Sequence, residues 1–303
     1  MTGDDEVFIA GVEVGPSIIR VGIFSQSLEL LGKTKLTTKP ERGSEAVIDR
    51  IARCIAYAAD ECDFPAQAVR QIGLGLPGQV CMETGRVIWA PHLGWLDVAL
   101  KAELEQRLMA SVVVGNIHQL GALGIFLKEA QPSPGRFAAL FPAGEIGCGL
   151  IVDGRIHDLA GFPPEAVQGD STINPAAVEF RHYRGRDFRK ALRKGSQPVR
   201  QFLNQVAINT GHVAARIIRE FSPAMIALGG GVMDEMRDEI LATVDATVRA
   251  DLGTNYPLQL VWITSHLGDL AGITGAAAST LAPTVPSNEP DVRSQSGLLA
   301  VQD

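Results

Sequence analysis

The sequence predicts an α/β protein that folds as two similar lobes around a central cleft. Its 303 residues suffice for one large domain or two medium ones. Two successive units, beginning near residues 7 and 136, each open with short apolar strands joined by tight turns and continue with alternating helix-like and strand-like segments. This repetition predicts an internal duplication, in which the glycine-containing turns near Gly15 and Gly144 face each other.

The first unit combines five expected strands with two expected helices. Each strand is an apolar run that ends at turn residues: 7–15, 18–25, 28–37, 69–78 and 112–114. A helix is predicted from about Glu45, because Ile48, Ile51 and Ile55 recur at helical spacing. A second helix is predicted near residues 97–108, where leucines share one face.

The second unit is expected to repeat this plan. Its strands are predicted at 136–144, 148–158, 224–231 and 258–265, and Asp153-Gly154 forms a tight hairpin turn within the second of them. Its helices are predicted at 198–221, at 233–249 and from Gly268 onward.

We divide the chain into three parts on this pattern. Residues 1–115 form a smaller α/β lobe, and residues 116–282 form a larger α/β lobe whose last helix packs back toward the first. The tail, residues 283–303, has linker composition and is expected to be flexible.

Composition indicates a soluble, cytoplasmic protein. Hydrophobic residues make up 46% and charged residues 20%, and no apolar run approaches the roughly 20 residues that span a membrane. A net charge of −7 argues against a nucleic-acid surface, so the basic stretch 181–195 is expected to be a solvated helix face or an anion-contacting loop. The four cysteines contain no C-x-x-C pair, which favours reduced thiols over a metal site: Cys54, Cys62, Cys81 and Cys148.

Several motifs occur in an order that matches a known family. They are GVEVGPSIIRVGIF (11–24), GLGLPGQV (73–80), PHLGWLDVALKAELEQRL (91–108), GCGLIVDGRI (147–156), FSPAMIALGGGV (221–232) and LGDLAGITGAA (267–277). From about Val7 to Leu281 the chain resembles the ROK family of bacterial sugar kinases and sugar-responsive repressors. The resemblance implies an actin-like, hexokinase-like ATPase fold with a central cleft, and a homodimer.

The resemblance also points to a lost catalytic group. A strand ends at Asn116, and the family's asparagine at this point is followed by an aspartate, the general base that takes the proton from the sugar hydroxyl. Here that position is Ile117, which has no proton acceptor, so no catalytic residue is assigned. General-base catalysis contributes about 10² to 10⁴ in rate. A helix begins at Ile117, so Asn116 either contacts a ligand or only caps this helix.

On the sugar side, the resemblance implies contacts from the side chains of Asn116 and Glu165 and from the backbone of Gly75 and Gly78. Gln168 stands where the family has a histidine that also binds zinc. Gln168 can still form hydrogen bonds but is a poor zinc ligand. The alternative is that Glu165 does not contact a ligand and is an exposed acidic residue in a loop.

On the nucleotide side, the matching positions are degenerate: Glu13, Gly15, Ser17, Gly144, Gly147, Gly229, Gly230 and Gly231. Pro16 removes one backbone donor from the first phosphate loop. Glu145 in the second loop would repel a triphosphate by about 4 kcal/mol per charge pair at 4 Å and an effective dielectric of 20. The glycine run 229–231 suits either a nucleotide or a plain strand-to-helix turn.

The sequence predicts neither a zinc site nor a dinucleotide cofactor. The segment GDSTINPAAVEF (169–180) replaces the family's zinc motif, so no zinc is predicted, and magnesium-ATP is implied only for an active kinase. GLGLPG (73–78) matches the dinucleotide fingerprint, but it leads into a strand-like hairpin rather than a helix. The sequence therefore does not favour a dehydrogenase.

Three functions follow in order of preference. The first is a catalytically impaired sugar-kinase homologue that binds a sugar or sugar derivative as a sensor or scaffold. The second is an ATP-dependent glucose-type or N-acetylhexosamine-type kinase with a relocated base, for which His118, Asp153 and Asp170 are candidates. The third is a transcriptional regulator that acts through a partner, because the first strand begins near Val7 and no DNA-binding domain of its own is expected.

Overall fold

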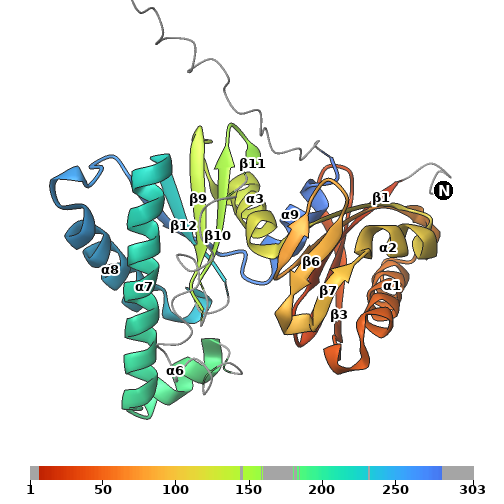
Figure 1. Cartoon of the computed structure of the whole chain (residues 1–303), viewed down its shortest axis with the longest axis horizontal. Helices are drawn as coiled ribbons and strands as arrows, with labels where there is room; N and C mark the ends of the chain where they lie inside the picture. The colour runs from red at the N-terminus through yellow and green to blue at the C-terminus, as the bar shows by residue number, and fades with distance from the viewer. Residues whose placement is uncertain are drawn as a thin grey trace, which may run out of the picture.

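The protein contains two five-stranded sheets with the same strand order (Figure 1). This computed structural model describes residues 7–143, 146–157, 159, 180, 183, 185–230 and 233–281. The first sheet has the order β3-β2-β1-β4-β8 and the second β11-β10-β9-β12-β13. In each sheet three antiparallel strands adjoin two parallel ones. The α/β class and the repeated plan expected from the sequence are confirmed.

The first sheet follows the expected apolar runs closely. Its strands are β1 (Phe8–Val14), β2 (Ile18–Phe24), β3 (Leu30–Thr37), β4 (Val69–Leu76) and β8 (Ser111–Asn116). Helices α1 (Ser44–Asp60) and α2 (Leu100–Leu108) cover its outer face, α1 against β2 and β3 and α2 against β8 (Figure 1).

A small three-stranded sheet follows β4, formed by β5 (Gln79–Cys81), β6 (Arg86–Ala90) and β7 (Trp95–Val98). The helix expected from about residue 97 was placed too early, since it begins at Leu100. The residues before it pair with β6, as in Trp89 opposite Leu96, and this pairing, rather than a local signal, defines their strand.

The second sheet consists of β9 (Arg136–Phe141), β10 (Gly147–Val152), β11 (Arg155–His157), β12 (Met225–Leu228) and β13 (Val261–Thr264). Helices α7 (Gln197–Phe221) and α8 (Met233–Leu252) pack against each other, and α7 also contacts β9. Within the basic stretch noted above, residues 185–193 form helix α6 (Gly185–Arg193). Short 3₁₀ turns occur at η1 (Pro40–Arg42), η2 (Ala66–Ala68), η3 (Pro91–Leu93) and η4 (Gly253–Asn255).

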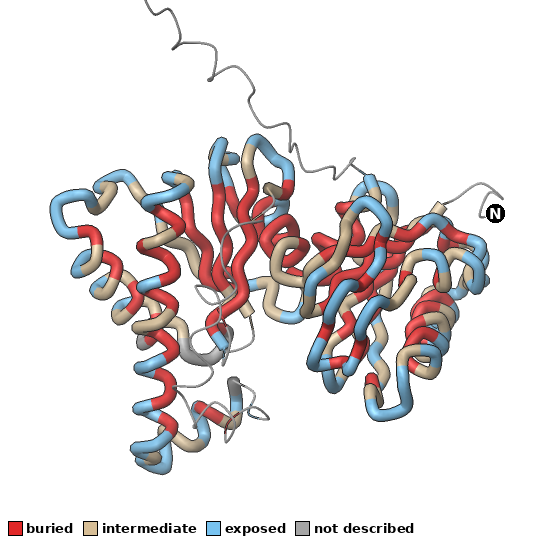
Figure 2. The backbone as a smooth tube through the Cα atoms, in the orientation of Figure 1, coloured by how far each residue is buried: buried red, intermediate tan, exposed pale blue. Residues whose placement is uncertain are grey.

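Helices α3 (Ile117–Glu129) and α9 (Leu270–Ala278) lie between the two sheets (Figure 1). Helix α3 packs under β9 and β10, α9 packs on β1 and β4, and the two helices pack on each other. Figure 2 shows that buried backbone runs through both sheets and through this pair of helices.

Glycines bring the backbone of α9 into direct contact with its neighbours. Gly11 and Gly73 are partners across β1 and β4, and a Cβ on either would overlap the backbone of α9. A Cβ on Gly275 would overlap the carbonyl oxygen of Leu120 in α3, and one on Gly124 would overlap the backbone of Ala271. Only residues without a side chain permit such close packing.

The four cysteines are free thiols, as expected. Burial raises the pKa of Cys54 and of Cys148 to about 12. Hydrogen bonds with Thr84 lower the pKa of Cys81, which is partly exposed. None of the helices in the described part of the chain combines the length and the apolar character required to cross a membrane.

We expect Gly73→Ala to destabilise the protein by about 2 to 3 kcal/mol, because its methyl group would displace the backbone of α9. Urea unfolding monitored by circular dichroism measures this change. Gly135→Ala is the matched control, since its Cβ would lie 3.6 Å from the nearest atom, Asp153 Oδ1, in ordinary contact. Equal stability of the two variants would contradict the packing described for α9.

Alkylation by iodoacetamide under mildly alkaline, native conditions should modify Cys81 first. Its lowered pKa gives it the larger thiolate fraction, and the thiolate is the reactive form. Cys54 and Cys148 should react only after unfolding, because they are buried and their pKa is raised. Peptide mass spectrometry over a time course gives the order, with a fully denatured sample as the control.

Candidate functional site

The carboxyl ends of β1, β4 and β8 meet at one edge of the first sheet. In the parallel register, Glu13 stands opposite Gly75 and Leu76 stands opposite Asn116. This edge of a parallel sheet is where α/β proteins bind ligands. The structure therefore brings Glu13, Gly75 and Asn116 from three separate strands to one place.

Asn116 forms the N-cap of α3 and also holds the turn after β4. Its Oδ1 accepts hydrogen bonds from the backbone N–H of His118 at 2.8 Å and of Gln119 at 3.4 Å. Its Nδ2 donates to the carbonyl oxygen of Gly78 at 3.0 Å. The capping role is therefore present, and the bonds of Asn116 with other described residues use one of its two amide hydrogens.

Ile117 fills the space beside the strand ends with an apolar side chain. A Cβ at Gly75 would lie 2.8 Å from Ile117 Cδ1, and so would a Cβ at Gly272 of α9. The side chain thus packs between the sheet edge and the first turn of α9. No group at this position can accept a proton.

A carboxylate lies close to the end of Ile117. The same Cβ position at Gly272 that is 2.8 Å from Ile117 Cδ1 is 2.9 Å from Glu13 Oε2. Arg20 donates to Glu13 Oε1 at 2.9 Å and pairs with Asp269 at 3.1 Å, so one guanidinium serves two carboxylates.

The surroundings of Glu13 favour the protonated form of its carboxyl group more strongly than water does for an ordinary glutamate. Its side chain is only 19% exposed, and burial raises the pKa of the carboxyl group. The positive charge of Arg20 opposes this shift, and the negative charge of Asp269 adds to it. Glu13 therefore carries a raised pKa despite its salt bridge.

The first expected phosphate loop is a hairpin turn closed by its own hydrogen bonds. The N–H of Gly15 donates to the carbonyl oxygen of Ile18 at 2.9 Å. The buried Thr38 donates its N–H to Ser17 at 3.0 Å and its hydroxyl to Gly15 at 2.6 Å. Pro16 has no N–H. The exposed Ser17 is the one residue of this turn whose N–H is not used in these bonds.

The second expected phosphate loop joins β9 to β10 and meets His118. A side chain at Gly147 would overlap the imidazole ring of His118, which also lies near the ring of Phe141, with 5.5 Å between centroids. His118 therefore covers the backbone at Gly147, on the side of α3 that faces the second sheet.

The strand-to-helix turn after β12 matches the expected nucleotide-side loop in position. Gly229 donates its N–H to the carbonyl oxygen of Leu140 at 2.8 Å, and Gly230 adopts a φ of 91° that favours glycine. The carbonyl of Gly230 accepts from the N–H of Met233 at 2.9 Å, at the start of α8. These contacts account for both glycines as parts of a tight turn.

The other expected residues are placed as follows. Asp153 lies in the turn after β10, about 20 Å from Gly147 along the chain at roughly 3.3 Å per residue, so it is remote from the loop. Six residues lie outside the described part of the chain: Gly144, Glu145, Glu165, Gln168, Asp170 and Gly231.

Sequence reasoning missed Arg20 and Asp269 as members of the site. The alternation of β2 places Arg20 opposite Glu13, a signal that strand pairing could have supplied. Asp269 comes from the other end of the chain, and only the packing of α9 on β1 brings it there. Among the described residues, no cluster of three or more His, Cys, Asp or Glu side chains is arranged to hold a metal ion.

Two sheets of matched order, joined through α3 and α9, together with glycine turns at the strand ends, define an actin-like, hexokinase-like sugar-kinase fold. A ROK family glucokinase from Streptomyces griseus, solved in complex with glucose and AMPPNP, has this fold. It superposes with a TM-score of 0.73 at 22% identity, over 90% of this chain and 99% of that one. The ROK family model matches residues 9–166 and 167–283, and the chain belongs to the ROK family.

Two relatives indicate how far the similarity reaches. A glucokinase from Thermotoga maritima is 24% identical over 319 residues, covering 89% of this chain and 96% of that protein. A glucokinase from Halalkalibacterium halodurans is 28% identical over 166 residues, which is 54% of this chain and 50% of that protein. The chain is thus a homologue of sugar kinases along most of its length.

Replacing Asn116 by alanine should cost about 2 kcal/mol of stability, roughly half from the lost helix cap and half from the lost bond to Gly78. Asn116→Ser is the matched variant, because serine caps the helix but is too short to reach Gly78. Thermal or urea unfolding should place the serine variant between wild type and alanine. A serine variant as unstable as alanine would mean that capping contributes little here.

Proposed function

We propose that the protein is a ROK-family sugar-kinase homologue that binds a sugar or sugar derivative as a sensor or scaffold, with phosphoryl transfer impaired. The observation that carries this proposal is Ile117. At the position of the family's aspartate, its apolar side chain packs between Gly75 and Gly272. A sugar hydroxyl at this point meets no proton acceptor from residue 117, and general-base catalysis from this position is lost.

The nucleotide side supports the same proposal. Hydrogen bonds within the first turn consume the N–H of Gly15, and Pro16 offers none. The ring of His118 covers Gly147 in the second loop. Backbone N–H groups that are already bonded cannot hold phosphate oxygens without being released. Each of these features weakens nucleotide binding independently of Ile117.

Sugar binding is supported by the groups that remain at the sheet edge. Asn116 uses one of its two amide hydrogens to hold the Gly78 turn in place beside it. The resemblance adds Glu165 and Gln168, and the similar glucokinase from Streptomyces griseus was solved with glucose. We place the protein in the cytoplasm as a homodimer on the basis of its family.

Isothermal titration with a panel of hexoses and N-acetylhexosamines, alongside ADP release from magnesium-ATP, tests this proposal. We expect saturable binding of at least one sugar and no sugar-dependent ADP. Absence of binding by folded protein across the panel would refute the sensor role. Rapid sugar-dependent ADP formation would show that phosphoryl transfer is not impaired.

Ile117→Asp should restore at most slow turnover, because the phosphate loops still oppose nucleotide binding. Ile117→Asn is the matched control, since asparagine has the size of aspartate but is no general base at neutral pH. ADP release should therefore rise in the aspartate variant alone, and only slightly. A fully active aspartate variant would show that the loops are competent and that residue 117 alone limits the rate.

A second candidate, an active sugar kinase with a relocated base, is favoured by one observation. Glu13 Oε2 lies 2.9 Å and Ile117 Cδ1 2.8 Å from the same point, the position of a Cβ on Gly272, so this carboxylate is near the side chain of residue 117. In this case the raised pKa of Glu13 sets the pH dependence. Because only the carboxylate form accepts a proton, the rate should rise with pH through that raised pKa.

Glu13→Gln tests whether Glu13 is the relocated base, provided that wild-type protein releases ADP in the presence of a sugar. The relocated base predicts a loss of about 10² to 10⁴ in kcat with sugar binding retained. Ser17→Ala, in the neighbouring turn, controls for general disturbance of the loop. Retained turnover in Glu13→Gln would assign the base to another residue.

A further inference from the structure

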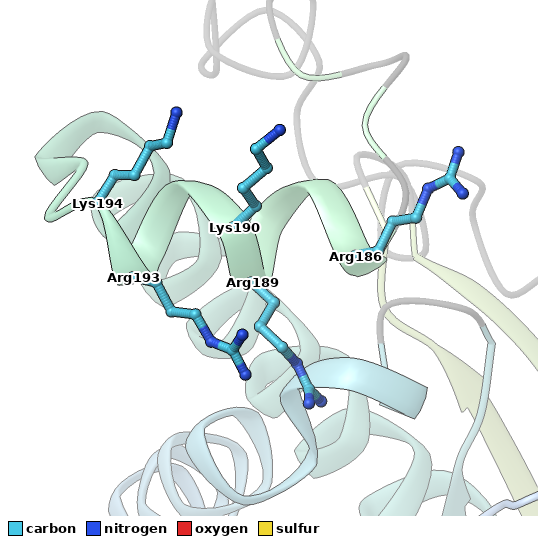
Figure 3. Close-up of a pocket in the computed structure, with 5 residues that line it drawn as sticks. All are labelled: Arg186, Arg189, Lys190, Arg193 and Lys194. Atoms are coloured by element: carbon cyan, nitrogen blue, oxygen red, sulfur yellow. The ribbon is translucent and has the colours of Figure 1, made fainter.

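Two surfaces lie apart from the sheet edge and are candidates for a further role. The basic side chains of α6 diverge, since Lys190 and Lys194 project to one side of the helix and Arg189 and Arg193 to the other (Figure 3). They therefore do not converge on one ligand. The second surface is the outer face of the small sheet β5–β7, which begins directly after Gly78.

One row of side chains crosses this outer face. Gln79, Trp89 and Leu96 are partners across β5, β6 and β7, and partners in antiparallel strands project to the same face of a sheet. All three are exposed, Trp89 by 49% and Leu96 by 75%. The next pair in the register, Ala90 and Trp95, is buried in the core of the first lobe. We call Gln79, Trp89 and Leu96 the Trp89 platform.

The Trp89 platform adjoins the residues proposed to bind the sugar. Asn116 donates to the carbonyl oxygen of Gly78 at 3.0 Å, and a Cβ on Gly78 would lie 2.5 Å from the carbonyl oxygen of Trp89. With only one residue between them, these two contacts keep the carbonyl of Trp89 within about 9 Å of the Asn116 amide. Gln79, the polar end of the platform, follows Gly78 in the chain. Adjacent rings of one oligosaccharide span such an interval.

The side chains of the platform suit a carbohydrate ring. A pyranose carries C–H groups on its faces and hydroxyl groups around its rim. The half-exposed indole of Trp89 offers a flat apolar surface to the ring face and an N–H donor at its own edge. The amide of Gln79 can donate to one hydroxyl and accept from another, and Leu96 extends the apolar contact.

The charges beside the platform cancel each other. Arg86 on β6 and Asp97 on β7 form a salt bridge, in which Nη2 donates to Oδ2 at 2.7 Å. Hydrogen bonding from Arg86 lowers the pKa of Asp97, so both partners remain ionised at neutral pH and their charges sum to zero. A neutral sugar therefore fits this surface better than an acidic or phosphorylated one.

We propose that the Trp89 platform binds the second ring of a neutral disaccharide whose first ring occupies the sheet edge at Asn116. This inference rests on the sugar binding proposed above and extends it from one ring to two. A single hexose at the sheet edge leaves Trp89 and Leu96 uncovered, whereas a disaccharide covers them. Trp89 is then the residue that distinguishes disaccharides from monosaccharides.

Isothermal titration with glucose, N-acetylglucosamine, maltose, cellobiose and N,N′-diacetylchitobiose tests the proposal on the full chain. At least one disaccharide should bind about tenfold more tightly than its monosaccharide unit. Trp89→Ala should remove this gain and leave monosaccharide affinity within about twofold of wild type. Tyr57→Ala is the matched control, because Tyr57 is an aromatic residue of similar exposure, 52%, on α1 and should change neither affinity.

Indole fluorescence reports on the contact directly. The chain has three tryptophans, of which Trp95 is buried and Trp262 belongs to β13 in the other lobe. A bound disaccharide should shield Trp89 from acrylamide quenching, and this protection should be absent with monosaccharides and in Trp89→Ala. Melting temperatures verify that each variant is folded. Leu96→Ser, at a more exposed position, provides a second variant and should weaken disaccharide binding severalfold.

The outcomes separate this inference from the function proposed above. If monosaccharides bind as tightly as their disaccharides, or if folded Trp89→Ala and Leu96→Ser keep the disaccharide affinity, the platform is overturned and sugar binding at the sheet edge stands. If no sugar binds to the folded protein, both proposals are refuted. A wild-type dimer that dissociates in Trp89→Ala, as measured by sedimentation, would assign the platform to an interface between two copies and would also overturn the inference.

Discussion

The direct backbone contact of α9 with its neighbours is the constraint on which the rest of the structure depends. Gly11 and Gly73 let this helix rest on the first sheet, and Gly275 lets it rest on α3, which in turn supports the second sheet. Backbone atoms in such contact have no side chains that could yield. The two sheets are thereby linked through a rigid pair of helices rather than through a loop.

The same packing assembles the candidate site. Because α9 lies on β1, its first turn brings Asp269 to Arg20 and Gly272 to Glu13 and Ile117. The side chain of Ile117 is accommodated because Gly75 and Gly272 both lack a Cβ. An isoleucine therefore fits at position 117 without disturbing the packing of the sheet edge on α9.

The expected strands of both sheets could be read from apolar runs bounded by glycine, proline and serine, since those signals are local. The strand Trp95–Val98 could not, because it is short and is defined by its pairing with β6, which leaves no local signal. At the site, the isoleucine after Asn116 can be read from the sequence, and the role given to this position stays a prediction that rests on the family resemblance. The association of Glu13 with Asp269 cannot be read in this way, because it depends on how the last helix packs on the first strand. The hydrogen bonds show that Asn116 caps α3, and its contact with a ligand stays a prediction.

Asn116 has a consequence beyond its own contacts. One amide joins the Gly78 turn, which carries the small sheet β5–β7, to the N-terminus of α3, which packs against the second lobe. A ligand that competes for this amide alters both connections at once. Occupancy of the sheet edge would therefore act directly on the helix between the lobes, so ligand binding has a route by which it changes the shape of the protein, with or without a chemical step.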